Sequence, residues 1–374
     1  MSKKHWVHDY ETLSNCFTGV FEHYKTQETK IFVIHDLRND FNAFVTFLQK
    51  CVTEKEWHIS YNGLAFDAQI THYVLDNYTK WSGLSGCEVA NLIYGCAQRT
   101  IEKSNKNEFS DYPQWKMKIG QIDLFKMHHW DNVAKRSSLK WIQYSMDWQN
   151  ILEMPIHHTA AIKTLEEIET ILEYCINDVR STKEIYNRSK SQVALRKELT
   201  NTYGIDMFSA SEPRISKEIF GYYLSQKLNI PKRDLRNMRT YRDSIKVRDI
   251  ILPYVSFTSP EFNLLLERFS SLEVDASNLK GSFRYKLNYK NITTHFGLGG
   301  VHGAAKKGIY ETGEDVMIMS SDVTSFYPNL AIKNQWSPGH FPKKEFSDQY
   351  EWFFEERKKI PKSNPMNYVY KIIL

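Results

Sequence analysis

The chain has 374 residues, of which 41% are hydrophobic and 14% aromatic, so general disorder is excluded and two or three domains are expected. Its net charge of +5 is compatible with a polyanionic partner but is far from a histone-like excess. The five cysteines form no C-x-x-C pair and predict reduced cytoplasmic thiols rather than disulfides or a zinc site. We expect no secretion or membrane insertion, because the first residues lack an apolar signal segment and no apolar run reaches about 18 residues.

Short apolar runs near residues 5–7, 16–21 and 31–34 predict three strands separated by polar turns. Helical spacing of apolar residues over 41–52 predicts a helix, and residues 57–61 predict a further strand. A second helix follows that strand. This order of elements predicts an α/β fold with a mixed sheet.

Acidic residues stand at the ends of these predicted strands. Asp9 and Glu11 are two residues apart at the end of the first strand, so both side chains point to one face. Asp67 closes the segment Asn62-Gly-Leu-Ala-Phe66-Asp67, where the strand at 57–61 leads into a helix. Taken singly, an Asp-x-Glu pair is frequent by chance and Asp67 is an ordinary helix N-cap.

The segment Tyr174-Cys-Ile-Asn-Asp178 adds a fourth acid, on a predicted helix where residues four apart share a face. Alone, this spacing is a common accident on a solvated helix. The three segments together, in this order, favour one shared site. Four carboxylates that converge repel each other unless cations lie between them, and carboxylate oxygens suit Mg²⁺ or Mn²⁺. Two such ions about 4 Å apart can activate a water and stabilise a departing 3′ oxygen.

This set of segments resembles the three exonuclease motifs of the proofreading domain in family B DNA polymerases, which has an RNase H-like fold. The resemblance implies four metal ligands: Asp9, Glu11, Asp67 and Asp178. It also implies that Tyr174 orients the attacking water, and that Asn62 and Phe66 hold the unpaired 3′ end of DNA.

The middle of the chain predicts a domain boundary near residue 200, a helix over 215–228 and a charge-rich loop over 230–250. From Lys280 to Lys290, aromatic residues alternate with basic or polar ones, which predicts an amphipathic strand. Its basic face either contacts the phosphates of a nucleic acid or is solvated. The glycine-rich segment Phe296-Gly-Leu-Gly-Gly-Val-His-Gly303 permits close backbone approach. It resembles the template-contacting segment of phage-type family B enzymes, which makes Gly299 and Gly300 candidate DNA-binding residues.

The segment Asp322-Val-Thr-Ser-Phe-Tyr-Pro-Asn329 is the most informative stretch of the sequence. Asp322 follows the apolar residues 316–319, which predict a buried strand, and Tyr327-Pro328 predicts a turn that directs the ring back toward Asp322. The alternative is a strand that ends in a Tyr-Pro turn with an ordinary acid. The segment resembles the first palm motif of family B polymerases. This implies that Asp322 is a catalytic metal ligand and that Tyr327 packs under the deoxyribose of a dNTP.

After this motif, residues 346–359 predict a helix, Pro361 and Pro365 bound a tip, and residues 367–374 begin a second helix. The pair resembles the finger helices of family B enzymes, whose basic residues grip the triphosphate. Arg357 and Lys371 are therefore candidate nucleotide-binding residues. For Arg357, a basic helix end that complements the helix dipole is the alternative.

The sequence departs from the family in one respect. It contains no Asp-Thr-Asp, the motif that carries the second polymerase carboxylate, and it stops after Lys371-Ile-Ile-Leu374. Two-metal transfer needs carboxylates on both sides of the ion pair, so we expect polymerisation only with a complementary C-terminal polypeptide. The resemblance divides the chain into an RNase H-like exonuclease domain over residues 1–200, a partial α+β palm over 201–340 and finger helices over 341–374.

The leading hypothesis is therefore the N-terminal part of a split family B DNA polymerase of bacteriophage type, in the cytoplasm of the infected bacterium. It would carry a Mg²⁺-dependent 3′→5′ exonuclease that acts on single-stranded and primer–template DNA. One alternative is a stand-alone exonuclease whose polymerase remnant serves as a DNA-binding platform. The other is a non-catalytic replication scaffold.

Overall fold

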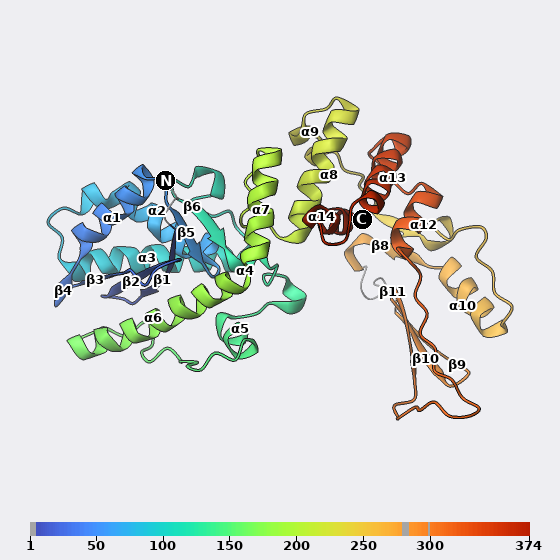
Figure 1. Cartoon of the computed structure of the whole chain (residues 1–374), viewed down its shortest axis with the longest axis horizontal. Helices are drawn as coiled ribbons and strands as arrows, with labels where there is room; N and C mark the ends of the chain where they lie inside the picture. The colour runs from blue at the N-terminus through green and yellow to red at the C-terminus, as the bar shows by residue number, and fades with distance from the viewer. Residues whose placement is uncertain (1–4, 279–283, 298–299) are drawn as a thin grey trace. The chain divides into compact units, whose positions relative to one another are not determined.

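The computed structural model describes residues 5–278, 284–297 and 300–374 (Figure 1). The chain forms two compact units. The first comprises Met1–Tyr223 and Glu355–Ile373, and the second comprises Leu224–Phe354 with Leu374. The predicted domain boundaries near residues 200 and 340 remain predictions. Within the described ranges, no helix has both the length and the apolar character that crossing a membrane requires.

A mixed sheet of six strands organises the first unit, in the order β4-β3-β2-β1-β5-β6. The strands are β1 (His5–Thr12), β2 (Phe17–His23), β3 (Thr29–His35), β4 (Arg38–Asn39), β5 (Trp57–Ser60) and β6 (Gly120–Asp123). Strands β1 to β4 pair antiparallel, whereas β5 pairs parallel with both β1 and β6. The predicted α/β class, the strands and the mixed sheet are confirmed.

Helices cover both faces of this sheet (Figure 1). Beside one face lie α1 (Phe41–Thr53), α2 (Asp67–Asn77) and α3 (Gly86–Asn105), and beside the other lies α6 (Leu165–Arg188). Each face has its own hydrophobic core. Trp6 and Tyr10 of β1 belong to the core that includes residues of α1–α3, whereas Val7 belongs to the core that includes residues of α6. Since alternate strand residues point to opposite faces, Asp9 and Glu11 point to the α6 side.

The helix that carries Asp178 ends just before Ser189. Helix α6 ends at Arg188, and α7 (Lys190–Tyr203) begins after a turn at Ser189. The Ser189 hydroxyl donates a hydrogen bond to the Ile185 carbonyl (2.7 Å) and lies 2.7 Å from His128 Nε2. A serine side chain that bonds the backbone of the preceding turn competes with helix continuation. The remaining helices of this unit are α4 (Leu124–Met127), α5 (Leu139–Ser145), α14 (Pro365–Ile373) and most of α8 (Glu212–Leu228).

The second unit contains a three-stranded antiparallel sheet, in the order β11-β10-β9. Its strands are β9 (Tyr285–Tyr289), β10 (Ile292–Gly297) and β11 (Gly300–Ala305). The other elements include α9 (Lys232–Asn237), α10 (Pro260–Ser270), α12 (Phe326–Asn334), and β7 (Ser244–Lys246), which pairs with β8 (Glu273–Asp275). The loop predicted for residues 230–250 is therefore partly wrong, because α9 and β7 interrupt it.

The buried strand predicted for residues 316–319 is wrong. Val316, Met317, Ile318 and Met319 are irregular in structure and between 56% and 82% exposed. An apolar run becomes a strand only when neighbouring strands pair with it and a core covers it, and neither occurs here among the described residues. The helices predicted for residues 215–228, 346–359 and 367–374 are confirmed as α8, α13 (Lys343–Lys359) and α14.

Candidate metal centre

Three of the four predicted acidic ligands meet at one point on the α6 side of the large sheet. Asp9 and Glu11 project from β1, and Asp178 projects from the middle of α6. One carboxylate oxygen from each of the three lies within 4.8 Å of the others. Packing of α6 against β1 produces this meeting, and the Cys175 thiol, 3.4 Å from the Asp9 carbonyl, is one of the contacts.

The fourth acid, Asp67, is the first residue of α2 and is 3% exposed. The charge of Asp67 adds, by electrostatic repulsion, to the burial that raises the pKa of Asp9. Within the described residues, Asp67 Oδ1 is buried and has no hydrogen-bond partner. An unpaired buried carboxylate oxygen costs free energy unless a cation binds it. Asp67 therefore offers a further oxygen donor, although it lies outside the group of three acids that come within 4.8 Å of one another.

Burial dominates the electrostatics of this centre. It raises the pKa of Asp9 well above the usual range, and repulsion from the other three acids adds to the rise. For the same main reason, the pKa of Glu11 rises to about 8 and that of Asp67 to about 7. The pKa of Asp178 is also raised, although hydrogen bonds from Gln143 and Tyr174 oppose the rise. A bound divalent cation would favour the ionised form of all four.

Tyr174 lies one helical turn before Asp178 and is 8% exposed. Burial and the charges of Asp178, Glu11 and Asp9 raise the pKa of its phenol, so the hydroxyl keeps its proton. The ammonium of Lys140 lies 5.2 Å from the Tyr174 ring centroid and is held by the Leu152 carbonyl at 2.6 Å. This neighbouring positive charge opposes the pKa rise of Glu11.

An open cleft of about 700 Å³ adjoins the acids. Its lining residues are Asp9, Tyr61, Asn62, Phe125, Arg136, Ser137, Ser138, Leu139, Trp141 and Asp178. The predicted DNA-binding residue Asn62 thus lies in the same cleft as two of the acids. Phe66 is partly buried and packs against the core beside α1–α3, and its predicted contact with DNA remains a prediction.

The turn that carries Asn62 is fixed by the buried carboxylate of Asp123. Asp123 accepts hydrogen bonds from the backbone N–H groups of Asn62 (3.0 Å) and Leu64 (3.1 Å), and it also caps α4. Gly63 makes this turn possible, because a Cβ there would lie 2.0 Å from Ser60 Oγ. Asn62 itself adopts a left-handed conformation with φ 65°. The sequence analysis assigned no role to Asp123. The only hint of this tight turn is the glycine at position 63, where a Cβ would collide with Ser60.

A second residue missed by sequence reasoning is Gln143 of α5. Its amide nitrogen donates to Asp178 Oδ1 (2.9 Å) and to the Ser181 hydroxyl (2.7 Å). The side chain is fully buried, and it fixes the orientation of the Asp178 carboxylate. Nothing in the local sequence distinguishes this glutamine from a surface residue, because its partner lies 35 positions away.

The structure does not place Asp322 in a comparable centre. Asp322 is exposed and irregular, and Tyr327 is 70% exposed. Across the described residues, the set of Asp9, Glu11 and Asp178 is the one group of three or more closely spaced acidic, histidine or cysteine side chains. The turn predicted at Tyr327-Pro328 is wrong, since both residues lie in the first turn of α12, where proline is tolerated.

The two candidate triphosphate-binding residues belong to the first compact unit. Arg357 lies in the last turn of α13, and Lys371 is exposed on α14. Asn367 joins these helices, because its amide nitrogen donates to the carbonyls of Arg357 (3.1 Å) and Ile360 (2.7 Å). Their predicted role in nucleotide binding remains a prediction.

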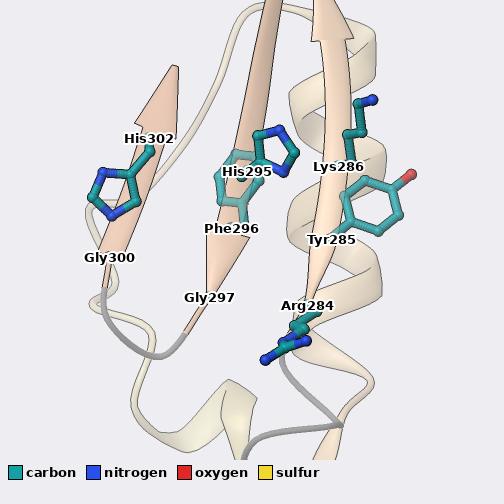
Figure 2. A pocket seen from close by; sticks show the side chains of 8 residues that line it. All are labelled: Arg284, Tyr285, Lys286, His295, Phe296, Gly297, Gly300 and His302. Atoms are coloured by element: carbon teal, nitrogen blue, oxygen red, sulfur yellow. The ribbon is translucent and has the colours of Figure 1, made fainter. Parts of the chain in front are cut away.

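A basic surface lies on the sheet of the second unit (Figure 2). Lys286, His295 and His302 are cross-strand neighbours in one row, and all three are exposed. With Arg284 and Gly300 they line a pocket of about 490 Å³ that contains no acidic side chain. Tyr285 and Phe296, which alternate with these residues, contact Phe269 of α10.

The alternation predicted for residues 280–290 is therefore confirmed from Arg284 onward. Phe283, at the start of that stretch, lies outside the described residues, as does Gly299. Gly300 opens β11 with φ 129°, a conformation that favours glycine. Its contact with DNA remains a prediction.

No protein-family model matches the sequence, and no curated protein matches it either.

Proposed function

We propose that this chain is a divalent-metal-dependent 3′→5′ DNA exonuclease with an RNase H-like fold, the proofreading part of a family B polymerase of bacteriophage type. The main support is the convergence of Asp9, Glu11 and Asp178, whose carboxylate oxygens lie within 4.8 Å of one another beside an open cleft. Asp67, with its unpartnered buried oxygen, supplies the fourth ligand. A group of buried acids this costly is typical of a catalytic site rather than of a structural one.

These residues fit two Mg²⁺ or Mn²⁺ ions, held by Asp9, Glu11, Asp67 and Asp178. When bound, such ions supply Lewis-acid activation of water and stabilise charge on the departing 3′ oxygen. Gln143 holds the Asp178 carboxylate, and the protonated Tyr174 hydroxyl, one helical turn away, is available to orient the attacking water. Asn62, presented by the turn that Asp123 fixes, binds the terminal nucleotide in the cleft.

The polymerase function is proposed only for an assembled enzyme. Asp322 would hold a metal ion and Tyr327 would pack against the deoxyribose, while Arg357 and Lys371 would bind the triphosphate of the dNTP. Two-metal transfer needs a second carboxylate, which the Asp-Thr-Asp motif carries in family B polymerases and which this sequence does not contain; the assembled enzyme would supply it. The basic surface around Lys286 would bind the primer–template duplex through its phosphates.

The exposure of Asp322 also favours a second candidate, a stand-alone exonuclease whose second unit serves only as a DNA-binding platform. Both candidates share the same nuclease site. A non-catalytic scaffold explains the buried acids less well, because a scaffold gains nothing from the raised free energy of four neighbouring carboxylates.

The test is degradation of a 5′-labelled single-stranded oligonucleotide by the purified chain with Mg²⁺, followed on a sequencing gel. We expect stepwise shortening from the 3′ end, abolished by EDTA. Asp67→Asn should lower the degradation rate by more than about 100-fold, which is the loss that removing an outer-sphere partner causes at a metal site. Asp147→Asn, which changes an exposed acid outside the centre, is the matched control and should retain the wild-type rate. A folded wild-type protein that leaves the DNA intact would refute the proposal.

A further inference from the structure

Helix α5 presents two large aromatic side chains to solvent. Trp141 is 59% exposed and Tyr144 is 68% exposed. Their rings stack, with centroids 5.7 Å apart and planes at 29°. Neighbouring exposed aromatic side chains beside a cleft are typical of a binding surface, because leaving them in water forgoes the free energy of burial.

This aromatic pair is continuous with the candidate active site. Trp141 lines the same cleft as Asp9 and Asp178. Two hydrogen bonds fix α5 relative to the acids: Gln143 of α5 donates to Asp178, and the Tyr61 hydroxyl donates to the Ser137 carbonyl (2.6 Å) just before the helix. The Ser138 hydroxyl accepts a hydrogen bond from the backbone N–H of Trp141 (3.2 Å) and thereby caps the start of α5. The backbone that carries Trp141 therefore has a defined position beside the acids.

A cation accompanies the aromatic pair. Arg136 lines the cleft and is exposed, and it makes no ion pair with any residue that the structure describes. Nearby lysines are already engaged, since Lys140 pairs with Glu153 and Lys126 with Asp131, each at 2.8 Å. A guanidinium without a carboxylate partner is free to bind phosphate through two parallel N–H donors.

Given the proposed exonuclease site, we infer that Trp141 and Tyr144 form a base-stacking platform for single-stranded DNA, with Arg136 on its phosphates. The terminal nucleotide occupies the cleft beside the acids, and the bases upstream of it stack on the two rings. Aromatic rings bind any base through its π-face, so the platform tolerates all sequences. Paired bases are stacked on one another and unavailable to it, so the ligand is a single strand of several nucleotides.

The experiment measures binding separately from catalysis. Fluorescence anisotropy in EDTA gives Kd for oligothymidylates of two, six and twelve nucleotides. We expect wild-type affinity to rise with length and Trp141→Ala to bind the twelve-nucleotide strand about 5- to 150-fold more weakly, the loss that one stacked base predicts. Trp141→Phe keeps an aromatic ring and should retain most of the wild-type affinity. Trp115→Ala removes a tryptophan that is 80% exposed outside the cleft, and it should bind like the wild type.

A second measurement separates the platform from the chemistry. The p-nitrophenyl ester of thymidine 5′-monophosphate offers one nucleotide and lacks the upstream bases that the platform would bind. The fold increase in KM caused by Trp141→Ala should be larger for the oligonucleotide than for the ester. Equal Kd values for Trp141→Ala and Trp115→Ala, or wild-type affinity independent of length, would overturn the platform. If the wild type hydrolyses neither substrate, the exonuclease proposal fails, while the length and variant series in EDTA still decides the platform.

Discussion

Two acidic motifs of this chain, at Asp9–Glu11 and at Asp322, suggest related chemistry in sequence but differ in structure. The first lies on a central strand, packed beneath α6, and meets Asp178 from 167 positions later in the chain. The second lies on an exposed, irregular segment, where no comparable set of ligands is present among the described residues. Both motifs are recognisable from residues that lie close together in the sequence. The difference shows that spacing can identify the residues of a site, whereas packing between distant elements creates it.

The electrostatic free energy of holding the carboxylates in place differs between the two motifs for the same reason. Around Asp9 the protein core holds carboxylates together, so the fold bears their mutual repulsion in the absence of a cation. Exposed Asp322 is solvated and needs no compensation. The first motif should therefore respond strongly to substitution, pH and metal ions.

The largest expected effect comes from removing one carboxylate charge at each motif in turn and comparing the two variants. Asp9→Asn removes a ligand shared by the whole centre and should abolish detectable DNA degradation in Mg²⁺. Asp322→Asn should leave the degradation rate of the isolated chain at the wild-type value, because Asp322 is exposed and outside the centre. Initial rates on a labelled single strand test both variants. Equal losses in the two variants would contradict the proposed division between the motifs.

The next effect is on stability as a function of pH. The pKa of Glu11 is raised to about 8 and that of Asp67 to about 7, and the pKa values of Asp9 and Asp178 are raised too. The folded state therefore binds more protons than the unfolded chain between about pH 4 and 8, and the free energy of unfolding falls as pH rises through this window. Each 1 kcal/mol lost should lower the Tm of a unit of this size by about 2–4 °C.

Calorimetry of the metal-free protein from pH 5 to 8 measures this slope. Mn²⁺ should raise the Tm more at pH 8 than at pH 5, because it binds the ionised acids. Asp178→Asn is the matched variant, and it should show both a shallower slope and a smaller Mn²⁺ shift. A metal-free Tm that rises across this range in the wild type but not in Asp178→Asn would contradict the assigned sign.

A smaller loss is expected from Asp123→Asn. The substitution keeps the shape of the side chain but weakens the hydrogen bonds from the Asn62 and Leu64 N–H groups. The turn that presents Asn62 should loosen, and activity should fall about 10-fold, the effect of losing about 1.4 kcal/mol of hydrogen bonding. Rates at saturating single-stranded DNA measure it, and Asp147→Asn again serves as control. Wild-type kinetics for Asp123→Asn would show that the turn needs no such support.

Much of this centre could be predicted from the sequence because its signals are local. The two-residue spacing of Asp9 and Glu11 and the four-residue spacing of Tyr174 and Asp178 reflect the periods of a strand and a helix. The roles of Asp123 and Gln143 could not be predicted, because their partners lie 59–61 and 35 positions away, respectively. The predicted strand at 316–319 was wrong for a related reason. Apolar composition does not reveal whether a partner strand is present.

The smallest expected effect concerns the basic row of Lys286, His295 and His302 on the sheet of the second unit. Lys286→Ala removes one exposed positive charge from the row that also contains His295 and His302. DNA affinity should fall only several-fold at about 0.1 M salt, and the slope of log K against log salt should decrease by about 1. Anisotropy of a labelled primer–template at several salt concentrations measures this slope, with the exposed Lys362→Ala as control. Asp9→Asn should keep the wild-type slope, since this substitution removes no positive side chain. A slope that changes equally in Lys286→Ala and Lys362→Ala would mean that this face is only a solvated surface.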